Sequence, residues 1–315
     1  MAAELARVVR NGFVESVHYG HVVVLRGGAV AFAAGDPHLA MLPRSSLKPV
    51  QAVATLAAAP ALAPVLTGER LAVACGSHTG EPFHLAAVDA ILSSAGLSRA
   101  DLRNVASWPE DESARDDEIR AGGTPAPVFM NCSGKHAAML AACVANAWPT
   151  DSYLVPDHPV QRGVVDATER LTGVPAATVA IDGCGACCPS TTLAGLAHAF
   201  ARIATGPDGS AEQAVAAAMR AHPEYVGGTG HVNTRFMQLV PGAIVKGGAE
   251  GVLVAATADG TAVAVKCLDG NPRATTAVAL AALRAAGAGV PPLPDLEQLP
   301  VLGGGVPVGR ILVTV

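Results

Sequence analysis

Short apolar runs separated by glycine and other turn residues mark strands near both ends of the chain. The runs His21 to Leu25 and Ala29 to Ala33 flank the turn Arg26-Gly27-Gly28, a pattern that predicts a β-hairpin. Runs of similar length predict further strands at about 71–75, 178–181, 243–246, 252–257 and 261–267. The last two runs surround the turn Asp259-Gly260.

Longer alanine-rich stretches between these strands predict helices. The stretch Pro43 to Pro49 introduces one that runs to about Ala59, because a serine cap and a proline in the first turn favour a helix start. We expect the other helices at about 82–95, 131–147, 159–171, 190–204, 210–221 and 273–286. The acidic stretch Glu110 to Glu118 is interpreted as a solvated loop.

Strands at both ends with helices between them predict an α+β fold. We expect one domain over residues 1–315, in which the terminal segments share an antiparallel sheet. The central part, about residues 80–240, is expected to be mainly helical.

Composition narrows the class of protein. Of the 315 residues, 50% are hydrophobic and only 15% charged, which excludes disordered, collagen-like and coiled-coil chains. A net charge of −5 argues against a nucleic-acid partner. The longest uncharged run, 49–68, contains three prolines, and its apolar residues are mostly alanine, so we expect no membrane span. The N-terminus shows no signal peptide, and a cytoplasmic location is expected.

Seven cysteines, an odd number, argue against a disulfide framework in a reducing compartment. Three lie in apolar stretches and are interpreted as core residues: Cys75, Cys143 and Cys267. Four lie beside Gly, Ser or Pro: Cys132, Cys184, Cys187 and Cys188. Thiols of the second group are soft ligands suited to a metal ion, and buried thiols near a turn are the alternative.

Lysine is rare in this chain. Among 21 basic residues only four are lysine, namely Lys48, Lys135, Lys246 and Lys266. A desolvated lysine amine can lose its proton, whereas an arginine guanidinium stays charged. Lys266 lies in a strand-like run and needs no special role, but the other three fall inside short polar motifs.

Two of these lysines have serines in positions that suit nucleophilic catalysis. Ser45-x-x-Lys48 places a hydroxyl and an amine one helical turn apart, so that a neutral lysine can activate the serine. Ser77 follows a predicted strand, and Lys246-Gly247-Gly248 ends another. This order of serine, lysine, serine and lysine-x-glycine is that of β-lactamases and penicillin-binding proteins. A helix cap, a turn and a strand-end charge are the structural alternatives.

Five separated motifs resemble those of the rhizobial-type L-asparaginases, the class 3 or "asparaginase II" family. They are PRSSLKPVQ, ACGSHTGEPFH, NCSGKHAAML, DGCGA and VKGGAEG, and the resemblance covers about residues 10–285. It implies a fold like that of serine β-lactamases and glutaminases. It also implies hydrolysis of L-asparagine to aspartate and ammonia.

The resemblance assigns roles to individual residues. Ser45 is implied as the nucleophile with Lys48 as its base, and Ser77 with Lys246 as a second pair. The implied zinc ligands are Cys132, Lys135 and Cys184, and the implied substrate-binding residues are Arg44, His136 and Asp182. Lys246 is followed by glycine where serine or threonine is common, and the resemblance assigns no role to Cys187 or Cys188.

The sequence therefore predicts a cytoplasmic amidohydrolase that attacks L-asparagine through a Ser45 acyl-enzyme, with one supporting zinc ion. The resemblance also implies a homodimer. The alternatives are a serine–lysine hydrolase of another amide (glutamine, a peptide or a β-lactam) and a non-catalytic zinc-binding protein of the same fold. Asparagine and glutamine differ by one methylene, which is worth only about 1–3 kcal/mol in a pocket.

Overall fold

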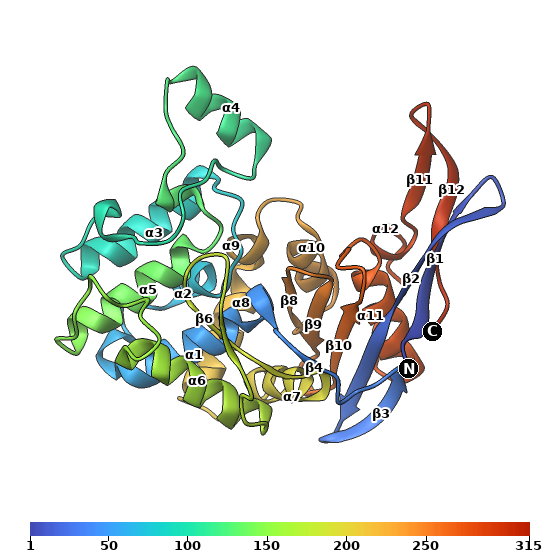
Figure 1. Cartoon of the computed structure of the whole chain (residues 1–315), viewed down its shortest axis with the longest axis horizontal. Helices are drawn as coiled ribbons and strands as arrows, with labels where there is room; N and C mark the ends of the chain where they lie inside the picture. Colours follow the sequence, from blue (N-terminus) through green and yellow to red (C-terminus); the bar gives the residue numbers. More distant parts are fainter.

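The computed structural model describes all 315 residues, and an antiparallel sheet occupies the right-hand half of Figure 1. Its strands run in the order β11 (Pro300–Gly303), β12 (Val306–Val313), β1 (Ala3–Arg10), β2 (Phe13–Arg26), β10 (Ala262–Cys267), β9 (Val252–Ala256) and β8 (Ile244–Gly248), with β3 (Ala29–Ala34) also paired to β2. The chain ends meet in neighbouring strands, since Val8 of β1 lies opposite Ile311 of β12. The α+β fold with a shared terminal sheet is confirmed.

The predicted hairpin is formed by β2 and β3. Both turn glycines have positive φ, 57° at Gly27 and 79° at Gly28, the backbone that a two-residue hairpin turn requires. Strand β2 begins earlier than predicted, because its first half pairs with β1 and its second half with β10. Lys246 lies on β8, which ends the strand order of the sheet.

Most of the twelve α-helices gather on the other side of the molecule in Figure 1, whereas the last two lie beside the strands of the sheet. The twelve are α1 (Lys48–Ala58), α2 (Gly68–Cys75), α3 (Pro82–Ser94), α4 (Glu112–Arg120), α5 (Ser133–Ala145), α6 (Pro159–Thr172), α7 (Leu193–Ala204), α8 (Ala211–Ala221), α9 (Pro223–Gly227), α10 (Val232–Leu239), α11 (Thr275–Ala285) and α12 (Pro294–Glu297). Helices α7 and α11 both pack against β2, β9 and β10. Every residue of β9 is buried, which shows that the sheet is covered on both faces.

One apolar cluster of 81 buried residues joins the sheet to the helices. Cys75, Cys143 and Cys267 belong to this cluster, as the sequence predicted. All seven cysteines are free and buried. Burial raises the pKa of Cys143 and of Cys267 to about 12, so both thiols stay protonated.

Two local predictions were wrong. The run Leu71–Cys75 is the end of helix α2, and it lacks a polar face because α1, α3, α5, α8 and α9 pack around it. The acidic stretch forms helix α4, which buries no residue. The Asp111 side chain caps α4 by accepting from Ala114 N at 2.8 Å, and Arg120 forms an ion pair with Asp117.

The strand predicted at 178–181 forms β5 (Val179–Ile181), but it is not buried: Val179 and Ile181 are 42% and 58% exposed. It pairs with β6 (Cys187–Pro189) in a two-stranded sheet. Strands β4 (Ala40–Met41) and β7 (Thr191–Thr192) form a second small sheet.

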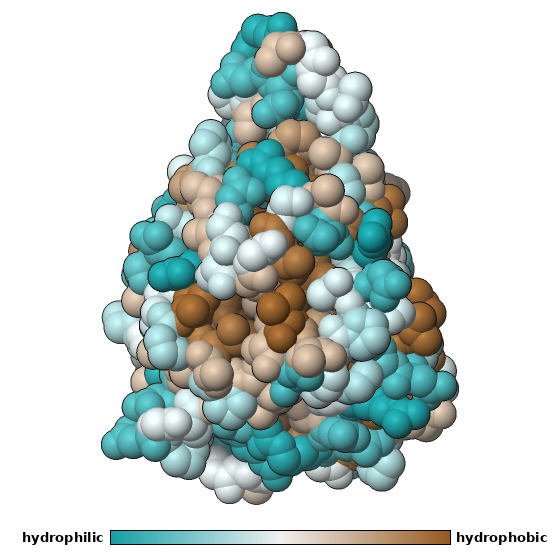
Figure 2. Space-filling view, turned by 90° about the vertical axis from the view of Figure 1, so that its left-hand side faces the viewer, coloured by the Kyte–Doolittle hydropathy of each residue, from teal (hydrophilic) through white to brown (hydrophobic).

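The charged helix α4 forms the apex of the molecule, and this apex is largely hydrophilic in Figure 2. Apolar side chains show lower on the same face, below α4. None of the helices combines the length and the apolar character that crossing a membrane requires.

Candidate active site

Ser77 lies between two lysine amines. Lys48 Nζ donates to Ser77 Oγ at 2.8 Å, and Lys246 Nζ donates to the same oxygen at 2.8 Å. The three residues come from the first turn of α1, the segment after α2 and strand β8. In the sequence, Ser77 is 29 positions from Lys48 and 169 positions from Lys246. The fold brings all three residues together at the Ser77 hydroxyl.

The segment after α2 is held by close backbone packing. A Cβ added to Gly76 would lie 2.5 Å from Tyr225 O, so only glycine allows this approach to α9. The next residue, Ser77, donates its backbone N–H to Val226 O at 2.9 Å. These contacts fix the position of the Ser77 hydroxyl between the lysines.

Both lysines are almost completely buried, with 0% exposure at Lys48 and 1% at Lys246. Burial lowers the pKa of Lys246 well below its usual value, and the charge of Lys48 acts in the same direction. Burial also lowers the pKa of Lys48. Two amines that share one hydroxyl in a dry site are suited to exchanging a proton.

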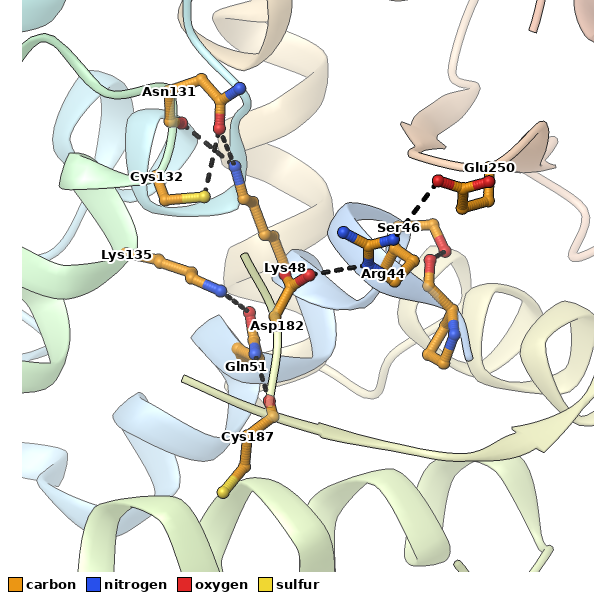
Figure 3. A network of polar contacts seen from close by, with 11 residues as sticks. Arg44, Ser46, Lys48, Gln51, Asn131, Cys132, Lys135, Asp182, Cys187 and Glu250 are labelled. Carbon is orange, nitrogen blue, oxygen red and sulfur yellow. Dashed lines mark hydrogen bonds and ion pairs between the residues drawn. The ribbon is translucent and has the colours of Figure 1, made fainter. Parts of the chain in front are cut away.

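Asn131 connects this pair to the surface. Its carbonyl oxygen accepts from Lys48 Nζ at 3.0 Å, and its side-chain Nδ2 donates to Glu110 Oε1 at 2.6 Å. Its Oδ1 accepts from Cys132 Sγ at 3.1 Å. Figure 3 shows the Lys48 side chain extending toward Asn131, with Cys132 beside it. Neither Asn131 nor Glu110 was selected from the sequence, although Asn131 opens the motif NCSGKH.

Ser45 has a different environment from Ser77. It lies in a short 3-10 helix, η1 (Arg44–Leu47), and its hydroxyl makes no hydrogen bond with the chain. The adjacent Ser46 is buried, and its Oγ donates to Pro43 O at 2.6 Å. The Lys48 backbone N–H donates to Ser45 O, but no hydrogen bond joins the two side chains, because the Lys48 amine points to Ser77.

A cavity of about 920 Å³ brings the two serines together. Ser45, Ser77, Asn131, Lys246 and Gly247 all line it. Three further polar groups that the sequence analysis did not select also line the cavity: Glu110, His231 and Asn233. The cavity therefore exposes one free hydroxyl, Ser45, and one hydroxyl held by two amines, Ser77.

The residues assigned to the substrate lie outside this lining. Arg44 Nε donates to Asp182 Oδ1 at 2.7 Å, and Arg44 has a left-handed backbone with φ 54°. The two charges compensate each other, as Figure 3 shows. His136 is completely buried and bonds through Nδ1 to the Tyr153 hydroxyl at 2.8 Å. Substrate binding by these three residues stays a prediction.

The L-asparaginase II family matches residues 6–313, nearly the whole chain. The protein belongs to this family. The predicted resemblance is thereby confirmed, and membership supports a hydrolase that acts on the amide of a small molecule.

Similar solved structures are distant in sequence. A β-lactamase from Mycobacterium bovis is 15% identical, with 85% of this chain and 94% of that chain covered and a TM-score of 0.46. Mglu in its native form is 15% identical, with coverage of 85% and 63% and a TM-score of 0.46. EstCE1, a hydrolase with promiscuous acyltransferase activity, is 11% identical, with coverage of 81% and 91% and a TM-score of 0.43. No curated protein sequence matches the chain.

In this L-asparaginase II family member the residues implied as zinc ligands lie together. Cys132 and Cys184 form a small buried cluster with Ala186. Interaction with the neighbouring Cys184 thiol lowers the pKa of the Cys132 thiol well below its usual value, and the same interaction raises the pKa of Cys184. Lys135 Nζ donates to Gln51 Oε1 at 3.2 Å (Figure 3), and the two nearby cysteines raise its pKa against the effect of burial.

This donor set fits a zinc ion. Two free thiols and one amine are ligands that zinc accepts, and three protein ligands leave one position open. No group of three or more His, Cys, Asp or Glu side chains is arranged for a metal anywhere in the chain, so a zinc site here depends on the Lys135 amine. Cys187 and Cys188 are buried on β6, outside the Cys132–Cys184 cluster.

Proposed function

We propose that this member of the L-asparaginase II family hydrolyses L-asparagine to L-aspartate and ammonia through an acyl-enzyme on Ser45. The observation that carries the proposal is the Lys48–Ser77–Lys246 bridge beside a cavity that the free Ser45 hydroxyl also lines. Family membership supports the amide substrate. The homodimer and the cytoplasmic location are part of the same proposal and rest on the family resemblance.

Ser45 is the better nucleophile because its hydroxyl is unpaired. Ser77 Oγ already accepts from both amines, so attack by Ser77 requires both hydrogen bonds to rearrange. A hydroxyl between two amines instead suits proton relay, since it can take a proton from one amine while giving its own to the other. The depressed pKa of Lys246 favours a neutral amine that accepts the Ser77 proton.

The proposed reaction has two stages. Ser45 Oγ adds to the side-chain amide carbon while its proton passes to Lys48, one turn along the chain. The C–N bond then breaks, and the proton that moves through Lys48, Ser77 and Lys246 leaves on the nitrogen as ammonia. A water molecule attacks the resulting ester, gives one proton to the relay and releases aspartate with the Ser45 hydroxyl restored. Backbone N–H groups, including that of Ser45, are the proposed donors to the oxyanion.

Ammonia release from L-asparagine and L-glutamine tests the reaction. We expect release from L-asparagine by the wild type and a loss of roughly 10³-fold or more in kcat for Ser45→Ala. Ser46→Ala is the matched control, because Ser46 bonds only to Pro43 O in its own turn, and it should retain most activity. Release from L-glutamine alone would contradict the substrate, and full activity of Ser45→Ala would contradict the mechanism.

We also propose that Cys132, Lys135 and Cys184 bind one zinc ion that supports the site. Bound zinc would supply a positive charge near Lys48 and tie the start of α5 to the loop after β5. Metal analysis of the purified protein should give about one zinc per chain, and Cys132→Ser should lose it. Cys188→Ser, a buried thiol outside the cluster, should keep it. If wild-type protein purified in zinc-containing buffer holds no zinc, the proposed zinc site is contradicted.

A further inference from the structure

The first turn of α10 faces the cavity with polar groups that the proposed mechanism does not use. Asn233 is only 3% exposed and lines the cavity, yet its carboxamide makes no hydrogen bond with the chain. Its backbone N–H is satisfied by His231 Nδ1 at 3.2 Å. Its carboxamide atoms are open to the cavity, where water or a ligand can supply the hydrogen bonds that the chain does not.

The Asn233 carboxamide lies against strand β8, next to the lysine that bonds Ser77. A Cβ built on Gly247 would be 3.6 Å from Asn233 Oδ1 and 3.7 Å from Nδ2. Gly247 directly follows Lys246, and all three residues line the cavity. A ligand group that reaches Asn233 is therefore close to the reacting end of the site.

His231 adds a second donor at the same place. Its Nδ1 is the acceptor that caps α10, so the neutral ring carries its hydrogen on Nε2. Burial and the charge of Lys246 lower the pKa of His231 to about 4, which keeps the ring neutral at pH 7. Nε2 makes no hydrogen bond with the chain, and the residue lines the cavity.

These groups select an anion over a cation. The N-terminus of a helix carries a partial positive charge, and Lys246 lies on the neighbouring strand. The helix N-terminus disfavours a substrate ammonium here, whereas a carboxylate would accept hydrogen bonds from Asn233 Nδ2 and His231 Nε2. The carboxylates that line the same cavity, Glu15, Glu110 and Asp295, belong to other elements, and none of them bonds to Asn233 or His231.

We propose that Asn233 and His231, at the N-terminus of α10, bind the α-carboxylate of the substrate. The inference rests on the proposed function in taking an amino-acid amide as the ligand, and it adds the residues that recognise its carboxylate. Asn233 is then a binding residue that sets how the amide carbon is presented to Ser45.

Two analogues of asparagine test the carboxylate and the ammonium group separately. Succinamate has the amide and the carboxylate but no ammonium, and 3-aminopropanamide has the amide and the ammonium but no carboxylate. Calorimetric titrations in a Ser45→Ala background avoid turnover of either probe. Asn233→Asp keeps the shape of the side chain and places a negative charge in the proposed site. Gln238→Glu makes the same amide-to-acid change at an exposed position of the same helix and is the matched control.

We expect Asn233→Asp to weaken succinamate binding at least tenfold and to leave 3-aminopropanamide within twofold, with Gln238→Glu unchanged for both. Asn233→Ala, which adds no charge, should weaken succinamate several-fold and serves if the aspartate variant does not fold. Equal weakening of both probes, no effect at Asn233, or no succinamate binding at all would overturn the proposal. Ammonia release from L-asparagine by the wild type is measured separately. Succinamate binding that depends on Asn233, without ammonia release, would keep the carboxylate site and reject the proposed function.

Discussion

Lys246 shows how one residue can serve catalysis at the expense of stability. Its amine is buried, with Ser77 Oγ and Gly247 O as hydrogen-bond acceptors and no carboxylate in contact. A buried amine without an acidic partner favours the neutral form, because the charged form loses its hydration. Neutrality is what a proton acceptor needs, and arginine cannot provide it.

The depressed pKa of Lys246 has a consequence for stability. The unfolded chain keeps a lysine that titrates near its ordinary pKa of 10.5, so between the folded pKa and 10.5 the unfolded state binds more protons. The contribution of Lys246 to the free energy of unfolding therefore rises with pH across that window, and it is unfavourable below the folded pKa. Activity should rise with pH for the same reason, since the neutral amine is the active form.

Lys246→Met tests whether the buried amine lowers the stability of the protein while turnover requires it. The variant keeps the length of the side chain and removes the ionisable group, so we expect the free energy of unfolding at pH 6 to rise by roughly 1–4 kcal/mol and its dependence on pH to become flatter. Turnover should be lost. Denaturant titrations at several pH values measure the first effect, with the partly exposed Lys266→Met as control. A variant that is less stable than the wild type at pH 6 would contradict the account.

At the scale of elements, the end of β8 positions the η1 turn that carries Ser45. A Cβ on Gly248 would lie 2.7 Å from Pro43 O and 3.1 Å from Ser46 N, so the strand and the turn touch through their backbones. Gly247, one residue earlier, has only ordinary van der Waals neighbours at 3.6 Å or more. Gly248 is therefore required by the close backbone contact, whereas the backbone around Gly247 has room for a larger residue.

Substituting each glycine by alanine tests this difference between the two positions. Gly248→Ala should cost about 1–3 kcal/mol of stability and lower kcat, because the methyl group displaces the turn that holds Ser45. Gly247→Ala should keep or slightly raise stability, by up to about 0.5–1 kcal/mol, and should raise KM because the methyl group enters the cavity beside Asn233. Thermal unfolding and steady-state kinetics measure both effects. Equal losses of stability in the two variants would contradict this explanation.

The element-level errors of the sequence prediction have a common cause. The run Leu71–Cys75 has no polar positions to reveal its period, because five helices surround it. Helix α4 has no apolar stripe, since its residues are mostly charged and even Ile119 is 53% exposed. Hydrophobic periodicity identifies elements with one buried face, and these two helices have either every face buried or none.

At the scale of the whole molecule, the sheet places residues that the sequence leaves far apart at one site. The motifs identified Ser45, Lys48, Ser77 and Lys246 because each has a local pattern, but their pairing depends on where β8 lies relative to α1 and α2. The sequence suggested two serine–lysine pairs that face the same pocket, and in the structure both lysines hydrogen bond to Ser77. Asn233 had no local signal, because its position at the site depends on where α10 lies relative to β8.

The central claim is that Ser45, and not Ser77, carries the acyl group. Rapid quenching of the wild type during turnover of L-asparagine, followed by peptide mapping by mass spectrometry, locates that group directly. The account predicts an aspartyl ester on Ser45, within the peptide that contains Ser46 and Lys48, and no modification of Ser77. An ester on Ser77, or turnover with no covalent intermediate on either serine, would contradict it.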